Sequence, residues 1–353
     1  MQQPVISGIQ QMGIGNPYVH EAWRWYRTHL GMDIKVFEEA AEANLMLPYT
    51  GGKPHKRHAV LAINLNGGGG FEIWQYTSRD PVAPSFELQA GDLGIYACKI
   101  KSRDVEATYR NMQEAGVELL GGIQTDPSGR AHFYLKDLYG NVFEVVPARS
   151  WYRKQRALTG GVYGAVVGVR DMDRSIAFYR DVLGYDDIVY REQGNFQDLA
   201  ALPGGNGGFE RVLLRHSQAR KGPFSKLLGP SEIELVRCLD RTPEPIFRDR
   251  YWGDLGFIHL CFDIVGMDAM KARCEATGQP FTVDSASSFD MGEAAGHFTY
   301  CEDPDGTLIE FVETHKVPLL KKIGWYMDLR GRDPEKPLPD WMLRAMALNR
   351  KRD

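Results

Sequence analysis

Three ionisable residues lie inside segments that are otherwise apolar. Glu72 lies in GFEIWQY, His259 in FIHLCFDI and Glu310 in LIEFV. Strand alternation puts Glu310 on one face with Leu308 and Val312, and both faces of that segment are apolar. A carboxylate in such a place is costly unless it is paired with a cation, protonated or bound to a metal. The three residues are therefore candidates for metal binding or proton transfer. The alternatives are a salt bridge for each carboxylate and an ordinary core histidine for His259.

The chain repeats itself, which indicates how such residues meet in space. Three pairs of segments are similar: WRWYRTHLGM (23–32) and IAFYRDVLGY (176–185), GDLGIYACKI (91–100) and GDLGFIHLCFDI (253–264), DLYGNVFEVV (137–146) and DPDGTLIEFV (303–312). The spacing between partners grows along the chain, so the second half carries small insertions in its loops. The two halves are copies of one another.

Each half divides again into two units, and each unit reads as a strand, a helix that ends in glycine, and further strands. A glycine in this place supplies the left-handed residue that closes a helix. The predicted helix ends are Gly31, Gly116, Gly184 and Gly278. We expect the first strands of the units near 5–14, 93–101, 162–169 and 256–264, and the last strands near 71–76, 142–147, 232–238 and 307–313.

The length of 353 residues predicts two domains with an appendage. We expect a first domain over 1–150, a linker over 151–160, a second domain over 161–315 and a basic C-terminal arm over 316–353. The arm holds ten basic and five acidic residues. We expect it to pack the side chains of Trp325, Tyr326, Trp341 and Met342 across the body. The alternative is an arm that covers a binding cup or grips an anionic substrate.

Four such units, with FYRDVLG closing a helix and DPDGTLIEF entering a last strand, resemble the vicinal oxygen chelate superfamily. That group includes glyoxalase I, methylmalonyl-CoA epimerase, extradiol dioxygenases and bleomycin-resistance proteins. The resemblance covers about residues 5–315 and implies an α+β fold. In it, four βαβββ modules form two half-open mixed β-barrel cups, with the helices outside.

The resemblance also implies where a metal would bind, because the family draws ligands from the first and last strands of its modules. The first-strand position falls on Gln11, Ala97, Gly164 and His259 in the four modules. The last-strand position falls on Glu72, Glu144, Glu234 and Glu310. Gln10 is the other possible register for Gln11, and His297 is a spare candidate near the fourth module.

The pairing of modules decides which of these residues meet. If the first module pairs with the fourth, one cup holds the complete metal-ligand set Gln11, Glu72, His259 and Glu310, and the other cup lacks both first-strand ligands. If neighbours pair, the C-terminal cup holds Gly164, Glu234, His259 and Glu310. That set misses a histidine of the dioxygenase triad of two histidines and one carboxylate. Glu144 and Glu234 mark a degenerate cup or pair with arginines.

The resemblance implies a metal-dependent lyase or isomerase of the glyoxalase type. Its cofactor would be one divalent ion, either Zn, Ni, Co, Mn or Fe, and its substrate a small oxygenated molecule. Glu72 and Glu310 would serve as catalytic base and acid. The alternative from another class is a metal-free protein that binds or sequesters a small molecule, as bleomycin-resistance proteins do. A non-haem iron dioxygenase is disfavoured by Gly164.

Composition indicates which classes of binding partner and which cellular compartment are expected. The net charge of −4 leaves no overall basic footprint for nucleic acid. No apolar run approaches the roughly 20 residues of a membrane helix. The five cysteines are scattered and form no CxxC pair, which favours reduced thiols in the cytoplasm. We therefore expect a cytoplasmic monomer or homodimer whose partner is a small molecule, and an anionic one if the basic arm takes part.

Overall fold

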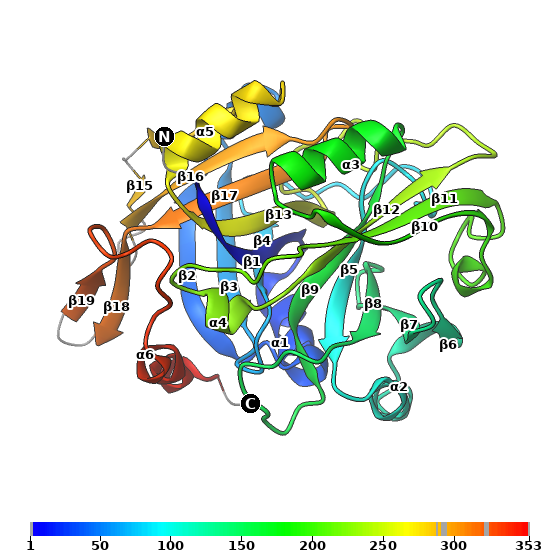
Figure 1. Ribbon diagram of the computed structural model, residues 1–353, viewed down its shortest axis with the longest axis horizontal. Coiled ribbons are helices and arrows are strands. Elements are labelled where there is room, and N and C mark those ends of the chain that lie inside the picture. The colour runs from blue at the N-terminus through cyan, green and yellow to red at the C-terminus, as the bar shows by residue number, and fades with distance from the viewer. Residues whose placement is uncertain (1–2, 287–288, 291–294, 321–324, 352–353) are drawn as a thin grey trace.

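The computed structural model describes residues 3–286, 289–290, 295–320 and 325–351. It contains four modules in which a strand and a helix are followed by further strands. The strands form two large mixed sheets, and the helices lie outside them (Figure 1). This confirms the predicted α+β class and the arrangement as two half-open barrels.

The first two modules lie in the N-terminal half. Module one consists of β1 (Val5–Gly15), α1 (Val19–Leu30), β2 (Ile34–Glu42), β3 (Lys56–Ile63) and β4 (Gly70–Tyr76). Module two consists of β5 (Gly94–Ser102), α2 (Val105–Glu114), β6 (Glu118–Thr125), β7 (Ala131–Lys136) and β8 (Val142–Pro147). The predicted first and last strands of both modules agree with these bounds to within one residue.

The other two modules and the arm follow. Module three consists of β9 (Thr159–Gly168), α3 (Met172–Asp181), β10 (Asp187–Asn195), β11 (Gly208–Arg215), α4 (Ser225–Leu228) and β12 (Glu232–Cys238). Module four consists of β13 (Gly256–Val265), α5 (Met267–Ala276), β14 (Val283–Asp284), β15 (Phe289–Asp290), β16 (Ala295–Glu302) and β17 (Leu308–Thr314). The arm consists of β18 (Lys316–Leu320), β19 (Trp325–Asp328) and α6 (Asp340–Ala345). Short 3₁₀ helices occupy Leu47–Tyr49, Gln197–Leu199 and Met346–Asn349.

The first module shares a sheet with the fourth, and the second with the third. The nine-stranded sheet, here called the first cup, has the order β14-β16-β17-β13-β1-β4-β3-β2, with β15 beside β16. The eight-stranded sheet, the second cup, has the order β10-β11-β12-β9-β5-β8-β7-β6. Antiparallel pairing of β1 with β13 and of β5 with β9 joins the modules. In Figure 1 the blue strand β1 therefore lies beside the yellow strand β13, although the two strands come from the first and the last module of the chain.

Glycine ends each main helix as the sequence predicted. Gly31, Gly116, Gly184 and Gly278 have φ values of 70°, 71°, 73° and 77°, the left-handed region that a residue with a side chain adopts at a cost. Helices α3 and α5 run along one side of the sheets in Figure 1, and α1 and α2 along the other.

The repeated motifs meet in pairs that tie neighbouring modules together. The Tyr26 hydroxyl on α1 donates a hydrogen bond of 2.6 Å to the Asp137 carboxylate in the DLYG turn of module two. The Tyr179 hydroxyl on α3 donates one of 3.1 Å to Asp303 in the DPDG turn of module four. All four side chains are buried. Sheets thus join modules one and four, while these helix contacts join one to two and three to four.

The C-terminal arm docks on the first cup. Leu338, Met342 and Leu343 pack with Ile34 and Ile63 in one buried cluster. The expected packing of Met342 against the body is confirmed. The expectation for Trp341 is wrong, because α6 turns the two residues after it toward the sheet and leaves Trp341 57% exposed. The side chains of Trp325 and Tyr326 lie outside the described residues.

Candidate metal centre

The first cup brings together the four residues that the sequence singled out. Gln11 lies on β1, Glu72 on β4, His259 on β13 and Glu310 on β17, which are four adjacent strands. The His259 Nε2 atom is 3.0 Å from Glu310 Oε2 and 3.4 Å from Glu72 Oε2. The Gln11 side-chain amide is 3.4 Å from each of these two carboxylate oxygens. All four side chains are buried.

The spacing of these atoms fits a divalent ion. Ligand atoms about 2.1 Å from a metal lie about 3.0 Å apart in an octahedron and about 3.4 Å apart in a tetrahedron. The four measured separations run from 3.0 to 3.4 Å. Gln11 Oε1 is buried and has no hydrogen-bond partner among the described residues, and His259 Nε2 is buried with only the two ion-paired carboxylates beside it. An ion among the four side chains would satisfy His259 directly, and Gln11 after a half-turn of its amide.

Burial and the neighbouring charges shift the pKa values at this site in opposite directions. Burial alone would lower the pKa of the His259 imidazole, but the carboxylates of Glu310 and Glu72 raise it to about 9. Burial by itself would raise the pKa of Glu72, yet the contact with His259 holds it below its usual value. Without a metal, a proton on His259 thus balances part of the negative charge. A bound cation would take over that role.

Three further residues shape the surroundings of His259. The Tyr300 hydroxyl lies 3.5 Å from His259 Nδ1, and the Trp252 ring stacks on the imidazole at 6.4 Å with an angle of 11°. Gly13 faces His259 across the β1–β13 ladder. A Cβ atom at Gly13 would lie 2.3 Å from His259 Cε1, so only glycine leaves room for the ring. The sequence reasoning missed these residues. The register of β1 against β13 was the signal needed to find Gly13.

The other candidates of the first cup lie apart from this group. Gln10 accepts a contact of 3.6 Å from the Cys261 thiol, so Gln11 is the register that faces the two carboxylates. His297 Nε2 is 2.6 Å from Asp284 and pairs there instead.

The second cup holds a lysine ammonium between its carboxylates. Lys99 Nζ is 2.8 Å from Glu144, 2.7 Å from Glu234 and 3.5 Å from Glu232. Arg211 also pairs with Glu234 at 2.7 Å, so both predicted last-strand glutamates have cationic partners. These partners hold the pKa of Glu234 far below its usual value even though burial opposes them.

The resemblance places Ala97 and Gly164 at the first-strand positions of this cup, and neither residue offers a donor side chain. Lys99 follows Ala97 by two residues on the same face of β5. It pairs with Glu144 in the ladder as Cys261 pairs with Glu310 in the first cup. Its long side chain brings a cation to the carboxylates. The first-strand position alone could not predict this cation, because Lys99 lies two residues farther along β5.

A cavity of about 800 Å³ opens beside the first-cup group. Gln11, Glu72 and Glu310 line it, whereas His259 does not. Pockets of roughly 300–1,000 Å³ commonly hold small molecules. The two carboxylates and the Gln11 amide are therefore the groups at this site that a bound molecule would meet.

Comparisons with known proteins agree with this architecture. The family model of the Glyoxalase/Bleomycin resistance protein/Dioxygenase superfamily matches residues 8–145 and 163–311. Glyoxalase I from Zea mays has a similar structure, with a TM-score of 0.54 and 14% sequence identity over 88% of this chain and 92% of that chain. A putative dioxygenase from Bacillus subtilis gives a TM-score of 0.55 at 12% identity, over 88% of this chain and 86% of that one. A search of curated proteins finds no match.

None of the described helices is long and apolar enough to cross a membrane.

Proposed function

Because the chain belongs to the glyoxalase/bleomycin resistance protein/dioxygenase superfamily, we propose that it is a metal-dependent lyase or isomerase of the glyoxalase type. The observation that carries the proposal is the buried group of Gln11, Glu72, His259 and Glu310 beside a cavity. The cofactor would be one divalent ion, either Zn, Ni, Co, Mn or Fe. Such an ion, when bound, polarises a carbonyl or enediolate oxygen.

The side chains divide the work by position. Glu72 and Glu310 line the cavity from two different strands, so each reaches a substrate from its own side. A carboxylate there removes a proton from one carbon, and a carboxylate returns a proton to the adjacent carbon. His259 lies behind them, held between Tyr300 and Trp252. We assign His259 and Gln11 to holding the ion, and Glu72 and Glu310 to both metal binding and proton transfer.

Two alternatives differ in what they require. A metal-free binding protein would use the cavity without an ion. A non-haem iron dioxygenase uses two histidines and one carboxylate. Among the described residues, the buried group has one imidazole and two carboxylates, which favours proton transfer over oxygen chemistry.

The substrate in this proposal is a small oxygenated molecule, and the protein acts as a monomer or homodimer in the cytoplasm. The five cysteines are free and buried, which suits a reducing compartment.

Metal content tests the proposal. Protein purified without chelator and dialysed should hold about one tightly bound ion per chain by elemental mass spectrometry. His259→Ala and Glu310→Ala should lose it. His297→Ala removes a histidine outside the group and should keep it. Loaded wild type, given 2-oxoaldehyde conjugates or epimerisable acids in D₂O, should place deuterium on the reacting carbon. Negligible metal even after reloading would overturn the enzyme and leave the binding protein.

A further inference from the structure

The C-terminal arm forms part of the lining of the cavity beside the metal group. Leu338, Met342, Leu343, Met346 and Leu348 of the arm line it. Module three contributes Phe224, Leu227 and Leu228, and β2 and β3 contribute Val36, Phe37, Leu61 and Ile63. The polar group of Gln11, Glu72 and Glu310 occupies one part of the lining, and much of the remainder is apolar.

Polar contacts fix the arm in this place. The Leu338 amide donates to the Pro223 carbonyl at 2.8 Å, and Lys226 pairs with the Asp340 carboxylate at 2.9 Å. The Lys351 amide donates to the Asp33 carbonyl at 2.8 Å, and Arg350 pairs with the Asp33 carboxylate. These contacts attach the arm near both ends of the segment 338–349, which supplies most of its lining residues. The arm is thus a fixed wall of the binding site.

The charges of the lining argue against an anionic tail. Arg57 is a cation of the lining, but its guanidinium already pairs with Glu39 at 2.9 Å. Lys316 is exposed, and Glu42 adds a negative charge. Within the described part of the lining, a carboxylate or phosphate entering this cavity would lose water without gaining an unpaired buried cation in return.

We propose that the substrate carries a neutral apolar tail, a hydrocarbon chain or ring system, that fills the cavity between the metal group and the C-terminal arm. This rests on the proposed function, since the oxygen-bearing head would lie at Glu72 and Glu310. Burial of each methylene favours binding, and longer tails should bind roughly three- to fourfold more tightly per added methylene until the cavity is full.

Alkyl hydroxamates test this, because their head binds metal through two oxygens. Dissociation constants for the metal-loaded protein should fall steadily from acetohydroxamate to octanohydroxamate. Met346→Trp narrows the cavity from the arm, so it should weaken the long members at least tenfold and leave acetohydroxamate unchanged. Trp341→Ala, on the exposed face of α6, is the matched control and should leave the series unchanged. A flat series in wild type would overturn the apolar tail while leaving the metal site intact.

A neutral fluorescent probe separates this inference from the proposed function. N-phenyl-1-naphthylamine needs no metal and should bind both wild type and His259→Ala, with displacement by octanohydroxamate only in loaded wild type. Probe binding to protein that takes up no metal would support the apolar cavity and overturn the metal-dependent function. The opposite result would be a protein that loads metal, does not bind the probe, and binds all the hydroxamates equally well. That result would support the metal site and overturn the apolar tail.

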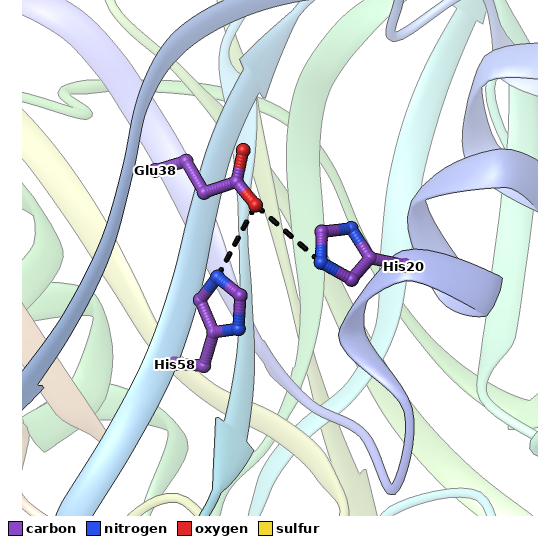
Figure 2. Close-up of side chains that lie close together, drawn as sticks. All are labelled: His20, Glu38 and His58. Carbon is purple, nitrogen blue, oxygen red and sulfur yellow. Dashed lines mark ion pairs between the residues drawn. The ribbon is translucent and has the colours of Figure 1, made fainter.

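A second group of ligand-type side chains lies outside the cups. His20 is in the first turn of α1, Glu38 is on β2 and His58 on β3. Figure 2 shows both imidazoles directed at the same carboxylate oxygen. The distances to Glu38 Oε1 are 3.4 Å from His20 Nε2 and 3.2 Å from His58 Nε2. Glu38 Oε2 pairs with Lys35 at 2.8 Å, which leaves Oε1 to the histidines.

This geometry suits zinc. Ligands of tetrahedral zinc, about 2.0–2.1 Å from the ion, lie about 3.4 Å apart, close to both measured distances. Two imidazoles and one carboxylate are a common zinc set that leaves a fourth position to water. The His20 side chain is 63% exposed, so an ion reaches it from solvent. We infer that His20, Glu38 and His58 form a second, weaker Zn²⁺ site that is independent of the first cup.

Zinc titration tests the second site. Calorimetry with ZnCl₂ on protein whose first-cup metal is already loaded should show one further event, weakened at least tenfold in both His20→Ala and His58→Ala. His29→Ala, on the same helix but outside the cluster, is the control and should retain it. Dialysis should remove this zinc and leave the tightly bound ion. An event unchanged in both variants, or none in wild type, would overturn the site.

Discussion

Replacing Lys99 by methionine tests whether an ammonium takes the part of a metal in the second cup. Methionine keeps the apolar stem but removes the charge that lies within 3.5 Å of Glu144, Glu232 and Glu234. Breaking a buried ion pair by removing one partner costs about 3–5 kcal/mol. Arg211 still pairs with Glu234 at 2.7 Å and His132 with Glu144 at 2.8 Å. We therefore expect the lower end, a loss of about 3 kcal/mol in the free energy of unfolding.

The loss should depend on pH in a definite direction. Burial opposes ionisation of Glu232 and Glu234, but Lys99, Arg130 and Arg211 hold both pKa values below normal. Carboxylates with lowered pKa values stabilise the fold above the unfolded pKa of about 4.5, and this contribution is lost as pH falls. Lys99→Met loses part of this stabilisation. The difference in the free energy of unfolding between the variant and wild type should therefore be largest near pH 7 and shrink below about pH 4.5.

Lys101→Met is a matched control for this measurement. Lys101 is also buried, and burial lowers its pKa to about 7. Its ammonium donates to the Ser150 carbonyl at 3.1 Å and lies 4.9 Å from the Trp151 ring centre. Urea unfolding followed by tryptophan fluorescence should show a change within about 1 kcal/mol for Lys101→Met. Equal stability of the two variants at pH 7 would refute the role of Lys99.

Three further predictions concern the first cup and the module contacts. Gly13→Ala should weaken metal binding at least tenfold in competition with a chelating dye, because its Cβ would lie 2.3 Å from His259 Cε1. Gly122→Ala is the control, since open space surrounds Gly122, and it should leave the affinity for metal unchanged. Equal affinities of the two variants would contradict the packing argument. Removing the metal with a chelator should lower the melting temperature of wild type but not of His259→Ala, and an unchanged wild type would mean that no ion stabilises the fold. Tyr179→Phe should lower the free energy of unfolding by about 1–2 kcal/mol in urea titrations, since it removes the 3.1 Å hydrogen bond to the buried Asp303 carboxylate. Tyr18 is exposed, so Tyr18→Phe should leave the free energy of unfolding unchanged. An unchanged free energy for Tyr179→Phe would refute the stabilising role of this hydrogen bond.

The internal repeats made most of the fold predictable from the sequence. They located the helix-ending glycines and the first and last strands, because each module has to solve the same packing problem with the same turn chemistry. The choice between module pairings stayed open, since the pairing of β1 with β13 joins residues about 250 positions apart and no local pattern encodes it. Once that pairing is known, Gln11, Glu72, His259 and Glu310 fall together.

Residues whose role depends on a neighbouring strand could not be found in this way. Gly13 matters because of the ring across from it, and Lys99 because its side chain reaches back past Ala97. The place of the arm on the first cup depends on buried contacts of Met342 and Leu343 with a distant part of the sheet. Such contacts arise from tertiary packing. The sequence predicted that Met342 packs on the body and offered an arm that covers a cup as the alternative, but it did not indicate which part of the sheet receives the arm.

The swapped pairing of modules sets an order on folding as the chain leaves the ribosome. Strands β5 to β12 complete the second cup once residue 238 has emerged. Module one is made first, yet β1 pairs along its free edge only with β13, which ends at Val265. Long-range pairing of this kind is slow and leaves strand edges open to wrong partners in the meantime. We expect the nascent first module to be the part of this chain that depends most on chaperones during synthesis.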